Sequence, residues 1–140
     1  MKQYVVDAFT NQIFKGNPAA VCILDEWINE DVMLNIAIEN NLSETAFAVK
    51  NSNQYEIRWF TPGGEVDLCG HATLATAFVI LNFYENTDEI YFKTIDNIQL
   101  SVKRRDTLYE MEFPAYDKYI PIKNETTLTT PELITTFLNV

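Results

Sequence analysis

The fold is decided by residues 61–83, which read Thr-Pro-Gly-Gly-Glu-Val-Asp-Leu-Cys-Gly-His-Ala-Thr-Leu-Ala-Thr-Ala-Phe-Val-Ile-Leu-Asn-Phe. A polar, turn-rich loop leads directly into a segment that is apolar on every side of a helix starting near Gly70. A helix that is apolar all round is buried, so the rest of the domain has to surround it. The sequence therefore predicts a central helix wrapped by other elements.

The first turn of this predicted helix is polar, in contrast to the remainder. It contains Gly70, His71 and Thr73, and Cys69 precedes it. The first four N–H groups of a helix have no partner within the helix, and the helix dipole attracts negative charge to that end. We therefore expect the N–H groups of Gly70, His71 and Ala72 to bind a small anionic group such as a carboxylate.

Shorter segments on both sides of the central helix have the patterns of strands and of one further helix. Asn29 is a suitable N-cap for a helix that ends near Asn40-Asn41 and whose apolar face comprises Val32, Met33, Ile36 and Ala37. The segment 44–49 alternates and predicts a strand with one strongly apolar face. The other predicted strands cover residues 4–9, 19–24, 55–59, 89–94, 98–102 and 108–113.

Two helices among about seven strands predict an α+β domain. In this architecture a curved, mainly antiparallel sheet wraps the central helix. From Tyr119 onward the composition changes to that of a linker, and Thr130-Pro131-Glu132 is typical of a helix start shortly before Val140. We expect one domain over residues 1–118, followed over residues 119–140 by a linker and the start of a truncated second domain.

Composition and charge exclude several classes of function. The chain has 140 residues and a net charge of −10, so nucleic acid and anionic membrane surfaces would repel it. The basic run Lys103-Arg104-Arg105 beside Asp106 is interpreted as a solvated hairpin tip. The sequence shows neither a membrane span nor a signal peptide, and its two cysteines do not suggest a secreted disulfide framework, which predicts a cytoplasmic protein.

Four polar clusters are candidates for chemistry: residues 7–18, 41–45, 63–67 and 69–71. If the second and fourth clusters meet at one rim of the domain, Glu44 and His71 face each other across a pocket. A partly desolvated carboxylate there would be suited to taking and returning a proton. Each residue also has a purely structural interpretation, in which Glu44 is an exposed acid, His71 a helix cap, and Asn17 and Ser43 ordinary loop and cap residues.

Cys69 has two interpretations as well. It is a small buried hydrophobe by composition, but a thiol at a helix N-terminus would have a lowered pKa and could act as an acid or base. A metal site is not predicted, because His71 is the only histidine and Cys22 lacks the spacing of a metal ligand.

At these residues the sequence resembles a known family. The motifs are Val-Asp-Ala-Phe-Thr (6–10), Phe-x-Gly-Asn-Pro-Ala-Ala-Val (14–21), Asn-Leu-Ser-Glu-Thr-Ala-Phe (41–47), Arg-Trp-Phe-Thr-Pro (58–62) and Glu-Val-Asp-Leu-Cys-Gly-His-Ala-Thr-Leu-Ala (65–75). Together, and in this order, they resemble the PhzF-like family of phenazine biosynthesis. The resemblance extends to about residue 115 and implies the diaminopimelate-epimerase fold, in which two similar domains enclose the active site.

The resemblance also implies a function. Glu44 would be the general acid/base that moves a proton between carbons of a small carboxylated substrate, without a cofactor, and His71 and Gly70 would help to bind that substrate. Cys69 stands where related racemases and epimerases have one of two catalytic cysteines. Family members are roughly twice as long as this chain, so the site would be completed by a second domain of the same chain or by a homo-oligomer partner.

Two other functions stay open at this stage. The first is a racemase or epimerase that uses Cys69 as one of two thiols. The second is a non-catalytic domain that binds a small molecule or another protein.

Overall fold

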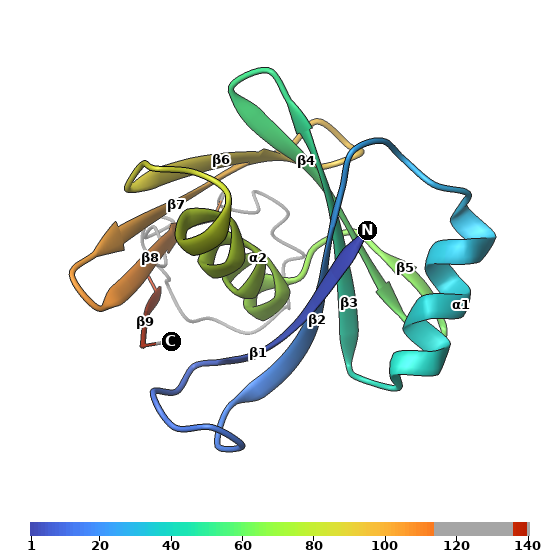
Figure 1. The fold of residues 1–140 in the computed structure, drawn as a ribbon, viewed down its shortest axis with the longest axis horizontal. Coiled ribbons are helices and arrows are strands. Elements are labelled where there is room, and N and C mark those ends of the chain that lie inside the picture. The colour runs from blue at the N-terminus through green and yellow to red at the C-terminus, as the bar shows by residue number, and fades with distance from the viewer. Residues whose placement is uncertain (114–135, 140) are drawn as a thin grey trace, which may run out of the picture.

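A long helix lies at the centre of the molecule, and a curved sheet wraps around it (Figure 1). The computed structural model describes residues 1–113 and 136–139. The central helix is α2 (Gly70–Phe83), and ten of its residues, from His71 to Leu81, are buried. The predicted buried helix is therefore confirmed, including its start at Gly70.

The sheet is mixed, and most of its strand pairs are antiparallel. The exceptions are the parallel pairs β2–β3 and β4–β6. Along the sheet the strands follow the order β1-β2-β3-β4-β6-β7-β8-β9, and β5 pairs with β4 outside this path. The strands are β1 (Lys2–Ala8), β2 (Asn17–Leu24), β3 (Glu44–Asn51), β4 (Gln54–Thr61), β5 (Gly64–Val66), β6 (Glu89–Lys93), β7 (Gln99–Arg105), β8 (Leu108–Glu112) and β9 (Thr136–Asn139).

Two of these strands were not expected from the sequence. β5 has three residues and lies in the glycine-bearing segment that is interpreted as a loop, where the strand pattern is too short to recognise. β9 occupies residues 136–139, where the helix beginning at Thr130 was predicted, so that prediction is wrong for these residues. Its backbone pairs with β8, which supplies a sheet edge that local sequence does not reveal. The predicted start of the helix lies outside the described residues.

The two helices lie on opposite faces of the sheet. Helix α1 (Glu30–Asn40) connects β2 to β3, and α2 connects β4 to β6, each as the crossover of a parallel pair. Such crossovers are almost always right-handed. Because β4 runs antiparallel to β2 while both connections step the same way along the sheet, this rule predicts helices on opposite faces. Figure 1 shows α1 outside the sheet and α2 within its curve.

Strand β3 is consequently buried on both faces, which corrects the prediction of a single apolar face. Ala46 and Ala48 belong to the core around α2. Phe47 and Val49 belong to a second core with Met33 and Ala37 of α1. A strand covered by helices on both faces is apolar at nearly every residue. A prediction from alternating apolar and polar residues therefore assigns such a strand too few buried side chains.

Helix α1 has the predicted boundaries. The Asn29 side chain accepts a hydrogen bond of 2.8 Å from the Asp31 N–H, and Asn41 ends the helix in the left-handed conformation with φ 50°. Met33 and Ala37 of its predicted apolar face are buried. Val32 is exposed instead, because it lies beside the buried stripe and not on it.

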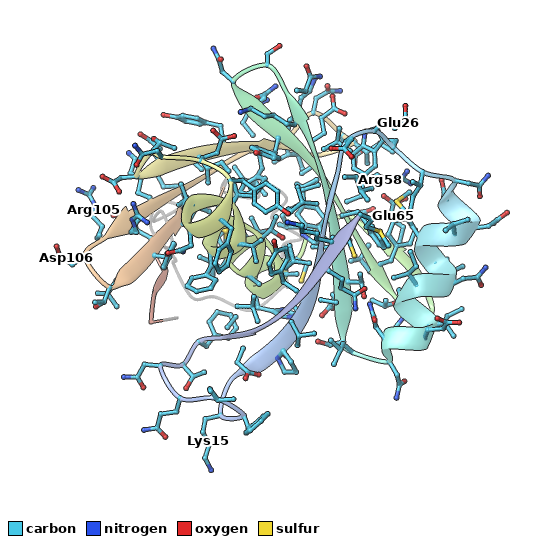
Figure 2. All side chains as sticks on the ribbon, in the orientation of Figure 1. Lys15, Glu26, Arg58, Glu65, Arg105 and Asp106 are labelled. Atoms are coloured by element: carbon cyan, nitrogen blue, oxygen red, sulfur yellow. The ribbon has the colours of Figure 1, made fainter. Side chains whose placement is uncertain are left out.

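The basic run 103–105 belongs to the hairpin of β7 and β8, and Figure 2 shows Arg105 and Asp106 at its outer end. Each basic side chain contacts an acid: Lys103 lies 3.3 Å from Glu89, Arg104 lies 2.6 Å from Asp88, and Arg105 lies 2.9 Å from Glu110. The run therefore forms local ion pairs at the surface. Among the described residues, no helix has both the length and the apolar character needed to cross a membrane.

Candidate active site

The candidate site lies where β2 and β3 begin and where α2 begins. β2 and β3 are parallel, with Ala19 beside Glu44, so their first residues meet at one rim. Side chains alternate along a strand, and Glu44 therefore faces the same side as Ala46 and Ala48, which is the side of α2. The topology thus directs the Glu44 side chain toward the first turn of α2.

The contacts at this rim join three separate segments of the chain. Oε2 of Glu44 lies 3.2 Å from Nε2 of His71. Oγ of Ser43 lies 3.3 Å from the same nitrogen and 3.4 Å from Oδ1 of Asn17. The prediction that Glu44 and His71 face each other at one rim is confirmed.

One atom of this group lacks a hydrogen bond. Oε2 of Glu44 is buried and has no hydrogen-bond partner in the part of the chain that the structure describes. Its contact with His71 is short in distance but lacks the alignment of a hydrogen bond. A buried carboxylate oxygen without a partner is costly for folding, and this one lies at a rim of polar groups.

The His71 side chain is kept neutral by its surroundings. It is only 8% exposed. Burial lowers its pKa below the ordinary value, and the nearby Glu44 carboxylate, which raises it, is the smaller effect. At neutral pH the ring is therefore an uncharged donor and acceptor, with one nitrogen of each kind.

The Cys69 thiol lies on the other side of the same ring. Its Sγ is 3.4 Å from Nδ1 of His71. Burial raises the thiol pKa to about 11, and the backbone N–H groups of Ala72 and His71 oppose this only in part. The lowered pKa predicted from the helix N-terminus is therefore wrong, because desolvation of the thiolate outweighs the stabilisation by helix N–H groups.

The other cysteine does not form a pair with Cys69. Cys22 belongs to the core beside α1, whereas Cys69 belongs to the core around α2. The sheet separates these two cores. Cys22 and Cys69 are the only cysteines of the sequence, so a second thiol for a two-cysteine mechanism would have to come from outside it.

Glu44, Cys69 and His71 offer donor atoms that lie within 4.8 Å of one another, a set that could be considered for a metal ion. However, Cys69 contacts Nδ1 and Glu44 contacts Nε2. A cation binds to one ring nitrogen along its lone pair, and the two lone pairs point in different directions. The arrangement fits a chain of hydrogen-bonding groups better than a metal centre.

The first turn of α2 differs from an ordinary capped helix. Its N-cap is Cys69, whose side chain makes no capping hydrogen bond, and the first turn contains no acid. Gly70 is partly buried and Ala72 fully buried. A Cβ at Gly70 would come within 2.9 Å of Cζ of Phe113, so this glycine allows an aromatic ring to lie against the start of the helix.

The loop between β1 and β2 forms the outer wall of the rim. Its shape depends on Asp7, whose Oδ2 accepts a hydrogen bond of 2.9 Å from the Phe14 N–H. It also depends on Gly16, where a Cβ would lie 2.2 Å from the carbonyl oxygen of Ala8. This close backbone approach explains the glycine of the Gly-Asn-Pro turn. This turn places Asn17 next to Ser43.

Two aromatic residues of the site were missed by sequence reasoning. The Phe9 ring lies 6.3 Å from the His71 ring, and Phe113 lies against Gly70. Neither has a local signal, because each comes next to the site only through the pairing of distant strands. Phe9 also has φ 68°, a backbone conformation that is rare for a bulky residue.

Fold and site together describe an α+β domain with a carboxylate and a neutral histidine at the start of a buried helix. The chain matches the phenazine biosynthesis-like protein family (PhzC-PhzF) over residues 6–136, and it belongs to this family.

Individual relatives agree with this assignment. A Pseudomonas aeruginosa protein described as an uncharacterized isomerase is 49% identical over 112 residues, which cover 80% of this chain and 43% of that protein. A crystal structure of a PhzF-family protein from Enterococcus faecalis is 52% identical, with a TM-score of 0.77, and the match covers 86% of this chain and 46% of that one.

A predicted epimerase from Pseudomonas aeruginosa shares the fold, with a TM-score of 0.66 at 20% identity over 79% of this chain and 42% of that one. The chain thus spans less than half the length of each of these three proteins.

Proposed function

We propose that this chain carries the acid–base half of a cofactor-independent isomerase, which moves a proton between two carbons of a small carboxylated substrate. The observation that carries the proposal is the buried, unpartnered Oε2 of Glu44 beside the neutral His71. An oxygen that no group among residues 1–113 and 136–139 satisfies is available to a substrate proton.

In the proposed reaction the ionised Glu44 removes a proton from a carbon next to a carbonyl or carboxylate group. The C–H bond breaks, its electron pair enters an enolate, and the proton moves to Oε2. Where a C=C bond of the substrate is conjugated with this enolate, the far carbon of that bond takes the proton from Oε2, the double bond shifts by one position, and Glu44 is ionised again. A single carboxylate serves as base and then as acid, so no external reductant or oxidant is needed.

The remaining groups stabilise the negative charge that develops. The N–H groups of Gly70, His71 and Ala72 are at the positive end of the α2 dipole. His71 adds a neutral donor. Oγ of Ser43 lies within hydrogen-bonding distance of Nε2 of His71, and Oδ1 of Asn17 lies within hydrogen-bonding distance of Oγ of Ser43. Such preorganised donors contribute most where water is excluded.

The thiol alternative has less support. A thiol with a pKa of about 11 is protonated at neutral pH and is a poor base. The sheet also separates Cys22 from Cys69. A racemase of the two-thiol kind would therefore need both a thiolate-stabilising change and a cysteine from another domain.

We also propose that a second domain of the same protein, or a partner copy, covers the site. The chain spans 43% of the length of its Pseudomonas relative. In the loop between β1 and β2, the exposed fraction is 75% for Ile13 and 91% for Phe14. Phe9, beside His71, is also exposed. Exposed large apolar side chains next to a polar site are typical of a surface that another domain covers.

The test measures the exchange of substrate protons with solvent. The protein is incubated in deuterated water with a panel of small mono- and dicarboxylates, and deuterium incorporation is followed by mass spectrometry. We expect Glu44→Gln to reduce incorporation by about 10²–10⁴-fold, the usual contribution of general acid–base catalysis. Glu39→Gln, an exposed acid on α1, is the matched control and should keep full exchange.

Each rival function gives a different result in this experiment. Full exchange by Glu44→Gln would eliminate the proposal. Exchange that is lost in Cys69→Ala but kept in Glu44→Gln would support the thiol mechanism. Binding of a carboxylate without any exchange, measured with the covering domain or partner copy present, would indicate a non-catalytic binding domain.

A further inference from the structure

Four polar groups form a continuous chain through the site. Cys69 Sγ lies 3.4 Å from Nδ1 of His71, and Nε2 of the same ring lies 3.3 Å from Oγ of Ser43. Oγ of Ser43 donates to Oδ1 of Asn17 at 3.4 Å. The chain therefore runs from a thiol, through both nitrogens of one imidazole ring, to an amide oxygen.

The direction of hydrogen bonding along this chain follows from its Asn17 end. The amide oxygen of Asn17 can only accept, so Ser43 uses its single hydroxyl proton toward it. Oγ of Ser43 then has only lone pairs left for His71. The ring proton must accordingly be on Nε2, where it points toward Oγ of Ser43, and Oε2 of Glu44 lies 3.2 Å from the same nitrogen without hydrogen-bond alignment.

The opposite nitrogen needs a donor as a result. With the proton on Nε2, Nδ1 is an acceptor, and it belongs to a ring that is buried. The thiol of Cys69 is the group that contacts it. A buried acceptor without a donor destabilises the tautomer that creates it, so the presence of the thiol favours one tautomer over the other.

We propose that Cys69 is a positioning residue, whose thiol donates to Nδ1 of His71 and thereby holds the ring in the tautomer with its proton on Nε2. This tautomer places a neutral N–H donor on Nε2, which donates to Oγ of Ser43 and lies 3.2 Å from Oε2 of Glu44. On the proposed function, in which Glu44 is the acid/base, a substrate oxygen that becomes negative takes this N–H donor in place of Oγ of Ser43. This step rests on the proposed function, whereas the assignment of the tautomer itself does not.

The chain offers a direct test because His71 is its only histidine. Labelling with ¹⁵N-histidine gives one imidazole ring, and a two-bond ¹H–¹⁵N correlation spectrum near neutral pH identifies the protonated nitrogen. We expect a pyrrole-type shift for Nε2 and a pyridine-type shift for Nδ1 in the wild type. We expect Cys69→Ala to show a mixture of both tautomers, and Cys69→Ser, which keeps a donor, to restore the wild-type pattern.

Cys22→Ala is the matched control, since Cys22 is also a buried thiol but lies in the other core. It should leave the His71 signals unchanged. A wild-type ring with its proton on Nδ1 would overturn the proposal, and so would a Cys69→Ala spectrum identical to that of the wild type. The wild-type spectrum decides the tautomer even if Cys69→Ala does not fold. The measurement needs no substrate, so its failure is distinct from a failure of the deuterium-exchange test.

Discussion

The two helices of this domain begin in opposite ways. Helix α1 starts with a side-chain cap from Asn29 and has two acids, Glu30 and Asp31, in its first turn. Helix α2 starts with Cys69, which makes no side-chain cap, and its first turn has no acid. Both devices of α1 stabilise an isolated helix end, and α2 has neither.

This difference agrees with the proposed function, in which α1 is structural and the start of α2 serves the site. At the start of α1 the Asn29 side chain accepts a hydrogen bond from the Asp31 N–H group, so this end of the helix is capped by its own sequence. The start of α2 keeps its N–H groups free of carboxylates from its own sequence, next to the His71 and Glu44 side chains. The stability of α2 has to come from the burial of its side chains instead. Three experiments test this contrast between a helix stabilised by its cap and a helix stabilised by burial.

The largest effect is expected from removing buried volume. Ile80 of α2 is fully buried, at 0% exposed, whereas Ile38 of α1 is 47% exposed. Ile80→Ala should lower the free energy of unfolding by about 2–5 kcal/mol, because it leaves a cavity in the core. Ile38→Ala should change it by about 0.5 kcal/mol or less. Urea denaturation of the two variants measures the difference, and equal losses would contradict the contrast between the two helices.

A smaller effect is expected at the cap of α1. Asn29→Ala removes the acceptor for the Asp31 N–H and should cost about 0.5–2 kcal/mol. Asn35→Ala, on the exposed side of the same helix, should be neutral or slightly stabilising because alanine is the better helix former. Thermal unfolding followed by circular dichroism compares them. If both variants lost stability equally, the Asn29 side chain would not be acting as a cap.

The sequence predicted the features that depend on local pattern. The bounds of α1 follow from Asn29 and Asn41, and the start of α2 follows from the change in polarity at Gly70. The meeting of Glu44 and His71 was also predictable, on the condition that their elements end at one rim. These predictions needed only the periodicity of helices and strands and the chemistry of their ends.

The features that local pattern could not predict depend on distant parts of the chain. β3 is buried on both faces because two crossover helices cover it. The thiol of Cys69 has a raised pKa because the surrounding core removes water from it, although a helix N-terminus by itself would lower that pKa. Phe9 reaches His71 only through the β1–β2 pairing. In each case the deciding contribution is tertiary burial.

The smallest expected effect is a pH dependence that arises at the start of α2. Burial lowers the pKa of His71 in the folded state, so below the ordinary value of about 6.5 the unfolded chain binds a proton that the folded chain does not. Protonation then favours unfolding. The stability that comes from keeping His71 neutral in the folded state is complete above about pH 6.5 and is lost as the pH falls toward the lowered pKa of His71.

Because His71 is the only histidine, His71→Gln removes this pH dependence without altering another group of the same kind. The free energy of unfolding, measured in urea between about pH 5 and 7.5, should fall more steeply for the wild type than for His71→Gln on acidification. A difference between the two proteins that stays constant with pH, or that grows in favour of the wild type in acid, would show that attraction to Glu44 outweighs burial at this ring.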